Sequence, residues 1–352
     1  SLYQPDCDAG GTMNLVESYL HANRQRFDLR RYGLDDGVSC LVLTPRFRAS
    51  RHVVFLVMPR NAGEPALVAK VARLPGASAS LEREASNLRA LEALIPDDDM
   101  AAPRLLAFDS VGEWPLLLET ALTGPLLTPE VIRARHDDAC RAVLDWLLRL
   151  HGKRAEAVDY ERLIDAPLRR FAAVFPLTRD ERMLLERTWE LTLPLTQTPL
   201  PVFMEHGDLS HPNIVWRRDG RIGVIDWELA DPNGLPAQDL FFFLTYAGFA
   251  SADAGNTGDY TGAFRQTFFG AGAWALPLVE AYASAVGLSS PQLTALFVAC
   301  WARYVVGLLD RLEDVPASGD VVPEETAAWL RNNRYSVLWR YAVDHVDELG
   351  WV

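Results

Sequence analysis

A short polar block between residues 204 and 232 constrains the fold of this chain more than any other segment. The sequence His-Gly-Asp ends at Asp208 and is followed by Asn213, and Asp226 comes directly after a short apolar run. Residues 217–221 are charged apart from one glycine, so they predict a turn between the two strands of a β-hairpin. Because a hairpin returns to its origin, we expect Asp208, Asn213 and Asp226 to converge.

These three side chains offer oxygen atoms as metal ligands and as proton acceptors. Carboxylate and amide oxygens suit Mg²⁺ better than zinc. Phosphoryl transfer uses one carboxylate to position the attacking hydroxyl and further oxygen atoms to hold the metal that bridges the phosphates. Isolated Asp and Asn residues also cap turns, which is the alternative for each residue taken alone. The spacing of the three residues together favours phosphoryl transfer.

The chain changes character near residues 120–125. Before that point, runs of β-branched and apolar residues predict five strands, and one segment repeats apolar residues at helical spacing. The strands are expected at 40–46, 53–58, 67–72, 104–108 and 116–119, and the helix at 80–94. Later in the chain helices dominate, and they are expected at 129–151, 179–193, 277–286, 291–312 and 323–347. We therefore expect an α+β fold with an N-terminal extension (1–36), a small lobe of antiparallel sheet plus one helix (37–122) and a larger, mostly helical C-terminal lobe (123–352).

The block H-G-D-x-x-x-x-N and the following I-D-W resemble the aminoglycoside phosphotransferase and choline kinase group, which are relatives of the protein kinases. The resemblance covers most of the chain. It implies a bilobal protein-kinase-like fold in which the N-terminal lobe binds ATP and the C-terminal lobe carries catalysis and substrate binding. By this resemblance Asp208 would be the catalytic aspartate, and Asn213 and Asp226 would be the Mg²⁺ ligands. Asp239 looks like the structural aspartate that braces the catalytic loop.

Lys70 interrupts a predicted strand that is otherwise apolar. A lysine in such a strand either reaches solvent from an edge or points into a cleft toward phosphate. The resemblance implies that Glu84, on the following helix, pairs with Lys70 and fixes its ammonium group beside the nucleotide phosphates. The alternative is a solvated helix face on which Glu82 and Glu84 are both exposed.

Two further segments would contact the nucleotide if the resemblance holds. No glycine occurs between Gly37 and Gly63, so the chain lacks the glycine-rich loop of protein kinases. The resemblance implies that Ser50 binds a phosphate instead, and the alternative is that the arginines of this loop are ordinary surface charges. The backbone near Glu119 and Ala121 lies where kinases bind adenine.

Composition excludes several other functions. The chain has 352 residues, with 34 Lys and Arg against 47 Asp and Glu, and its formal net charge is −13. Such a surface repels nucleic acid, and no basic patch offsets it. The four cysteines lack metal-ligand spacing, which favours reduced thiols in the cytoplasm. The apolar runs are too short to span a membrane, so we expect a cytoplasmic protein without a membrane partner.

The acceptor is the least constrained part of the prediction. Only twelve residues separate Asp226 from Asp239, which is too short for the activation segment of protein kinases and favours a small-molecule substrate. Acidic residues between 310 and 325 would attract a cationic substrate such as an aminoglycoside or an amino alcohol, or they are a solvated helix boundary. The main hypothesis is an ATP- and Mg²⁺-dependent phosphotransferase that moves the γ-phosphate to a hydroxyl. Its alternatives are a Ser/Thr kinase acting on a peptide in modified-peptide biosynthesis and a catalytically silent, nucleotide-binding pseudokinase.

Overall fold

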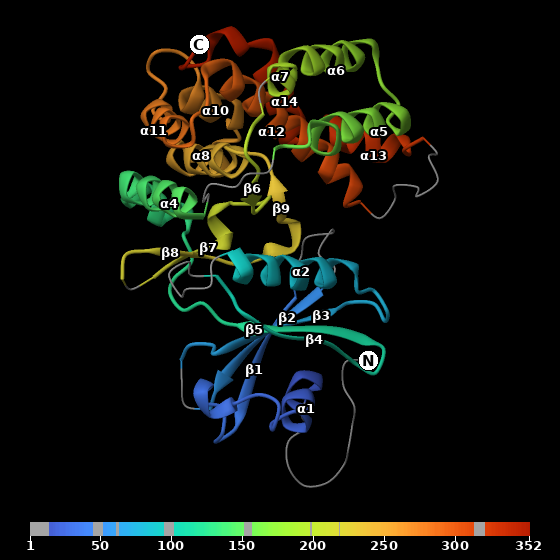
Figure 1. Cartoon of the computed structure of the whole chain (residues 1–352), viewed down its shortest axis with the longest axis vertical. Coiled ribbons are helices and arrows are strands. Elements are labelled where there is room, and N and C mark those ends of the chain that lie inside the picture. The colour runs from blue at the N-terminus through green and yellow to red at the C-terminus, as the bar shows by residue number, and fades with distance from the viewer. Residues whose placement is uncertain are drawn as a thin grey trace. The chain divides into compact units, whose positions relative to one another are not determined.

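The computed structural model describes residues 14–44, 52–60, 63–94, 102–150, 157–197, 199–217, 219–312 and 321–352 (Figure 1). The chain divides into two compact units. The first unit consists of Ser1–Pro125, Val215–Asp219 and Gly223–Leu229, and the second consists of Leu126–Ile214, Gly220–Ile222 and Ala230–Val352.

A five-stranded antiparallel sheet forms the centre of the first unit. Its strands are β1 (Val38–Leu43), β2 (His52–Pro59), β3 (Leu67–Ala72), β4 (Leu105–Val111) and β5 (Trp114–Thr120), in the order β1-β2-β3-β5-β4. The middle strand β3 pairs with β2 and β5, and almost all of its side chains are buried. A strand covered on both faces needs a nearly continuous apolar sequence, which explains why Lys70 is the exception within it.

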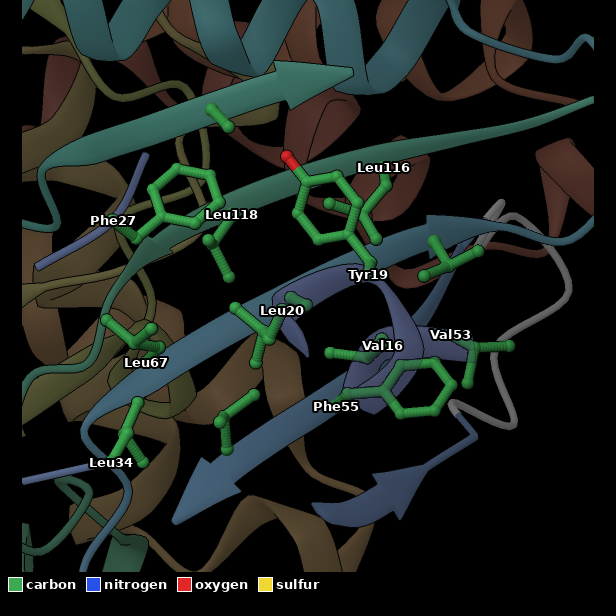
Figure 2. Close-up of a cluster of buried hydrophobic side chains, with 14 residues drawn as sticks. Val16, Tyr19, Leu20, Phe27, Leu34, Val53, Phe55, Leu67, Leu116 and Leu118 are labelled. Carbon is green, nitrogen blue, oxygen red and sulfur yellow. The ribbon is translucent and has the colours of Figure 1, made fainter. Parts of the chain in front are cut away.

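Helices cover both faces of this sheet. The helix α2 (Ala79–Leu94) contacts β4 and β5 and buries Leu81 and Ala85 against them. On the other face, α1 (Leu15–Ala22) begins with a capping box between Asn14 and Glu17. Figure 2 shows the apolar cluster that joins α1 to the sheet, with labelled side chains from both, including Val16, Tyr19, Leu20, Phe55, Leu67, Leu116 and Leu118. The predicted order of strands and helix is confirmed, and α1 and the 3₁₀ turn Leu29–Tyr32 are additions to it.

The second unit is mostly helical. Its helices are α3 (Pro129–Ala134), α4 (His136–Leu150), α5 (Ala166–Val174), α6 (Arg179–Thr192), α7 (Pro194–Gln197), α8 (Gln238–Ser251), α9 (Ala254–Thr257), α10 (Tyr260–Phe268), α11 (Leu276–Val286), α12 (Ser290–Asp310), α13 (Glu324–Arg331) and α14 (Arg334–Asp344). A π-helical turn, Glu161–Asp165, precedes α5. Two short strands, β6 (Phe203–Glu205) and β9 (Asp231–Gly234), pair antiparallel.

The helix α12 lies at the centre of this unit and contacts α5, α6, α8 and α14. Its Phe297 and Trp301 pack edge-to-face against Phe241 of α8 and Phe264 of α10. By length and composition α12 could cross a membrane, so the prediction that every apolar run is too short is wrong. However, 78% of its most apolar window is buried inside the structure, as in the core helix of a soluble protein.

Two long helices predicted from the sequence are each divided. The helix predicted at 129–151 is broken at Arg135, which separates α3 from α4. The helix predicted at 323–347 ends at Arg331, and α14 begins after Asn333, whose side chain accepts a hydrogen bond from the Tyr335 N–H. Asparagine is a favoured N-cap because its side chain satisfies a free N–H of the first turn, so the break has a local cause.

The predicted hairpin is confirmed. Its strands are β7 (Ile214–Trp216) and β8 (Ile222–Val224), which form a two-stranded sheet. A 3₁₀ turn, η4 (His211–Asn213), comes directly before β7, and another, η5 (Trp227–Leu229), follows β8. The boundary between the two units runs through this hairpin.

Candidate active site

Lys70 lies at the centre of a charged cluster within the first unit. It is in the middle of β3, pairs with Val54 of β2 and Leu117 of β5, and is only 5% exposed. Its Nζ donates to Oε1 of Glu84 over 2.6 Å and to Oδ1 of Asp226 over 2.8 Å. A buried ammonium group is stable only when anions compensate for its lost hydration, and here two carboxylates do so.

Glu84 belongs to the buried face of α2 and is 0% exposed, whereas Glu82 is exposed. The same Oε1 that binds Lys70 accepts a hydrogen bond from the Trp227 N–H at 3.2 Å. Asn87, one turn further along α2, donates to the Trp227 carbonyl at 2.9 Å. The helix thus fixes the backbone directly after Asp226 as well as the ammonium of Lys70.

Asp226 follows β8 and has a φ of 70°, in the left-handed region. A residue other than glycine adopts this conformation at a cost, and aspartate and asparagine tolerate it best. Trp227 anchors the segment, because its buried indole donates from Nε1 to the Val224 carbonyl at 3.0 Å. The strained backbone directs the Asp226 carboxylate toward Lys70.

Negative charge exceeds positive charge around Lys70. Burial alone would lower the pKa of Lys70. The charges of Asp226, Glu84 and Glu119 nevertheless hold this pKa well above its ordinary value. Burial raises the pKa of Glu119 to about 8, and burial together with the Asp226 charge raises the pKa of Glu228 to about 7. A divalent cation would relieve this excess of negative charge.

The available ligands suit Mg²⁺ shared with phosphates. Among the residues that the structure describes, no three His, Cys, Asp or Glu side chains gather as a metal cage. Mg²⁺ bound to nucleotide phosphates typically needs one or two protein carboxylates, with phosphate oxygens and water as the other ligands. The Asp226 carboxylate offers oxygen atoms of this kind within the first unit, and the Asn213 side chain carries an amide oxygen within the second.

The predicted adenine-binding residues lie at the end of β5. The Ala121 N–H donates to the Ala66 carbonyl at 3.0 Å, so this amide is already engaged within the first unit. The side chain of Glu119 is 2% exposed, and its Oε2 has no hydrogen-bond partner in the described part of the chain. The prediction from the sequence concerned backbone groups here and did not include this carboxyl group. The sequence feature that could have indicated the buried Glu119 carboxyl group is an acidic residue at the end of an apolar strand.

Ser50 lies outside the described residues. Its neighbour His52 begins β2 and is buried, with Nδ1 3.9 Å from Oε2 of Glu228. Burial and the Lys70 charge lower the pKa of His52 to about 4, so its imidazole is neutral at physiological pH.

Asp208 and Asn213 come together within the second unit. Asp208 lies in the loop after β6, and Asn213 ends η4. The Asn213 side-chain amide donates to the Asp208 carbonyl at 2.9 Å and to Asp208 Oδ2 at 3.2 Å. These bonds occupy Nδ2 and leave the amide oxygen of Asn213 as the atom that could bind a metal.

Asp239, at the start of α8, braces this loop. Its two carboxylate oxygens accept hydrogen bonds from the backbone N–H groups of His206 at 2.6 Å and Gly207 at 3.0 Å. Burial, reinforced by the charge of Glu205, raises the pKa of Asp239 to about 7. The structure thus places Asp239 in contact with the loop that carries Asp208.

A second buried network, which was not predicted from the sequence, supports the same loop. Arg303 of α12 donates from Nη1 to both carboxylate oxygens of Glu205, at 3.1 and 3.0 Å, and to Gln238 Oε1 at 3.0 Å. Glu205 also accepts from the Leu235 N–H at 2.9 Å. The sequence signal was the single arginine in the apolar sequence of α12, because a buried arginine requires an acidic partner.

The structure therefore brings the predicted residues together in two groups. Lys70, Glu84 and Asp226 meet in the first unit, and Asp208, Asn213 and Asp239 meet in the second. The roles assigned to these residues stay predictions, as does the convergence of Asp208 and Asn213 with Asp226.

Comparison with known proteins identifies the fold. A family model described as the phosphotransferase enzyme family matches residues 47–282. The crystal structure of aminoglycoside phosphotransferase APH(4)-Ia is 14% identical, with a TM-score of 0.53 over 91% of this chain and 98% of that chain. A ternary complex of a thermostable mutant of APH(4)-Ia with ADP and hygromycin B is also 14% identical, with a TM-score of 0.53 over 90% and 98% of the two chains.

A choline/ethanolamine kinase family protein from Mesorhizobium loti is 16% identical, with a TM-score of 0.51 over 88% of this chain and 92% of that chain. A search of curated proteins by sequence gave no match. These comparisons confirm the predicted α+β, protein-kinase-like fold.

Proposed function

The chain belongs to the phosphotransferase enzyme family, and from this premise we propose that it moves the γ-phosphate of ATP, bound with Mg²⁺, to a hydroxyl group of a small molecule. The observation that carries the proposal is the buried ammonium of Lys70, held between Glu84 and Asp226. A structural ion pair would need one carboxylate. A lysine fixed by two carboxylates, inside a cluster with excess negative charge, is suited to Mg²⁺ and phosphate together.

Each group has a distinct role in the proposed reaction. Lys70 binds phosphate oxygens, and Glu84 prevents its ammonium from moving away. Asp226 and the amide oxygen of Asn213 would hold Mg²⁺, which neutralises charge on the phosphates when it is bound. Asp208 accepts the hydroxyl proton while the oxygen attacks phosphorus, and Asn213 holds that carboxylate in one orientation.

We propose that the nucleotide binds to residues of the first unit. A carboxyl group at Glu119, the backbone near Ala121 and the hydroxyl of Ser50 are the candidate contacts for base and phosphate. The related APH(4)-Ia mutant was crystallised with ADP, which supports a nucleotide as the donor. ATP and reduced thiols are both typical of the cytoplasm, and we place the protein there.

The acceptor is proposed as a small-molecule alcohol. The prediction of a cationic acceptor depends on the acidic residues between 310 and 325. Of these, Asp310 pairs with Arg170 at 3.0 Å and Glu324 with Arg331 at 2.9 Å, while Glu313, Asp314 and Asp320 lie outside the described residues. Neutralised carboxylates attract a cation weakly, so among the described acids of this segment the exposed Glu325 is the one that would attract a cation.

The test is ADP release from Mg²⁺–ATP by the wild-type protein and by Asp208→Asn. The acceptor panel holds aminoglycosides, amino alcohols, nucleosides, hydroxy acids and Ser/Thr peptides. Turnover with a small-molecule acceptor that the variant loses would support the proposal. Turnover with peptides alone would replace it with a peptide kinase. ATP binding without turnover of any acceptor would favour a nucleotide-binding module.

A further inference from the structure

Three tyrosines gather near Asp208 within the second unit. They are Tyr246 of α8, Tyr304 of α12 and Tyr335 of α14, and we call them the tyrosine cluster. The rings of Tyr304 and Tyr335 lie 4.4 Å apart, and the hydroxyl groups of Tyr246 and Tyr335 are hydrogen-bonded to each other. Tyr335 is buried, whereas Tyr246 and Tyr304 are partly exposed, so the cluster has an accessible side.

The cluster is tied to the loop that carries Asp208. The ring of His211, in the same 3₁₀ turn as Asn213, lies 5.5 Å from the ring of Tyr246. In addition to burial, the charge of Asp208 raises the pKa of the phenol groups of all three tyrosines. Tyr246 therefore lies beside the turn that ends at Asn213, and the charge of Asp208 acts on all three phenol groups.

Two arginines lie on the rings of this cluster. The guanidinium of Arg311 lies 5.1 Å from the ring centre of Tyr304. That of Arg334 lies 5.3 Å from the ring centre of Tyr335 and 4.9 Å from that of Tyr260. Tyrosine faces can bind cations, but here guanidinium groups already occupy them. A polycationic acceptor would meet two positive charges at this place.

Arg334 carries a positive charge that an anion could pair with. It is solvent-exposed, and it forms no ion pair with any residue in the described part of the chain. Contacts with the rings of Tyr260 and Tyr335 hold its guanidinium beside the tyrosine cluster. A guanidinium fixed in this way can bind a carboxylate through two parallel hydrogen bonds at a reduced entropic cost.

We propose that the tyrosine cluster and Arg334 form the acceptor subsite beside Asp208, and that this subsite takes a ring-bearing alcohol with an anionic group, such as a hydroxy acid, in place of a polycation. The inference rests on the proposed function, because it assumes that Asp208 acts on the acceptor. The partly exposed side chains of Tyr246 and Tyr304 would contact the ring of the acceptor, and Arg334 would pair with its anionic group. A hydroxyl on the far side of that ring would then face Asp208.

The experiment uses three probes that differ in one group: para-(hydroxymethyl)benzoate, its carboxamide and its aminomethyl analogue. Binding to the full-length protein is measured by ligand-observed NMR titration. We expect the benzoate to bind roughly fivefold to tenfold more tightly than the carboxamide, and the amine to bind most weakly. In Arg334→Gln the preference for the benzoate should disappear, and in Arg334→Lys it should be reduced. Arg340→Gln, an exposed arginine on the same helix, is the matched control and should keep the preference.

Three results would overturn the subsite: tighter binding of the amine, a benzoate preference that persists in Arg334→Gln, or no binding of any probe at millimolar concentration. An unchanged melting temperature of Arg334→Gln separates loss of the contact from loss of the fold, and Arg334→Lys replaces it as the test if Arg334→Gln is unstable.

ADP release in the same samples separates the acceptor subsite from the proposed kinase function. An Arg334-dependent benzoate preference without any turnover would leave the subsite and overturn the kinase function. Asp208-dependent turnover of polycations, unaffected by Arg334→Gln, would do the reverse.

Discussion

Lys70 and Glu84 form a buried ion pair, with Nζ 2.6 Å from Oε1, and the same carboxylate oxygen also accepts from the backbone of Trp227. One glutamate thus sets the position of two groups: the lysine that would bind phosphate and the segment that carries Asp226. Because Glu84 is 0% exposed, no solvent competes for its oxygen. Loss of its charge should therefore affect nucleotide binding more than an exposed ion pair would.

The first prediction concerns Glu84→Gln. The amide keeps the shape but loses the charge, so the affinity for Mg²⁺–ATP should fall by roughly tenfold. Isothermal titration of the nucleotide into the protein measures this change. The matched control is Glu82→Gln, an exposed glutamate on the same helix, which should leave the affinity unchanged. Similar losses in both variants would contradict the role given to Glu84.

Asp208→Asn should separate catalysis from nucleotide binding. Without a carboxylate to take the hydroxyl proton, the transfer rate should fall by about 10²–10⁴-fold. The affinity for ATP should stay within about twofold, because the proposed phosphate contacts lie elsewhere. Single-turnover kinetics and nucleotide titration provide the two readouts. Asp145→Asn, an exposed aspartate of α4, is the control for a general effect of lost charge. Equal loss of rate and affinity would refute the assigned role.

Asp226→Asn should instead change the metal dependence. Asparagine accepts the left-handed conformation found at this position, so the backbone should be retained. The Mg²⁺ concentration that gives half-maximal activity should rise by roughly tenfold or more, because one negative ligand is lost. Asp226→Ala removes the ligand and adds backbone strain, and comparison of the two melting temperatures separates these effects. An unaltered Mg²⁺ requirement in Asp226→Asn would rule out Asp226 as a ligand.

Asp239→Ala should destabilise the second unit. Both carboxylate oxygens accept backbone N–H groups, and the substitution removes these two acceptors from His206 and Gly207. The free energy of unfolding should fall by about 2–4 kcal/mol, as expected for the loss of two buried hydrogen bonds to a carboxyl group. Asp239→Asn retains one acceptor and should lose less. Chemical denaturation of the three proteins measures the order, and an alanine variant as stable as the wild type would show that the bracing bonds contribute little.

Much of the first unit could be predicted from the sequence, because its signals are local. Alternating and continuous apolar runs indicated the five strands, and helical spacing indicated α2. Lys70 and Glu84 were identified because each departs from a regular pattern or matches a known motif. The exposed fraction of Glu82 and the break before α14 needed the structure, since periodicity alone does not distinguish neighbouring acidic residues or a cap within a helical run.

The acceptor region could not be predicted in the same way. Tyr246, Tyr304 and Tyr335 come from three helices far apart in the sequence, and only tertiary packing brings their rings together. Each tyrosine taken alone reads as an ordinary core residue. The buried Oε2 atom of Glu119, which has no hydrogen-bond partner among the described residues, could not be predicted either, because burial of an acid at a strand end depends on what packs over it.

Glu119 also makes the stability of the protein depend on pH, in a direction that its raised pKa determines. Burial raises that pKa from 4.5 to about 8, so the folded protein retains a proton that the unfolded chain releases. The stabilisation from this proton is complete below about pH 4.5, and it declines as the pH rises toward about 8. In Glu119→Gln no proton is lost at this site, so the variant should become more stable than the wild type, by roughly 1–3 kcal/mol, at about pH 9. Melting temperatures measured from about pH 5 to about pH 9 test this, with Glu113→Gln, an exposed glutamate of the turn before β5, as the control. Parallel pH profiles for Glu119→Gln and the wild type would show that Glu119 is ionised in the folded protein, with the charge of Lys70 compensating for its own.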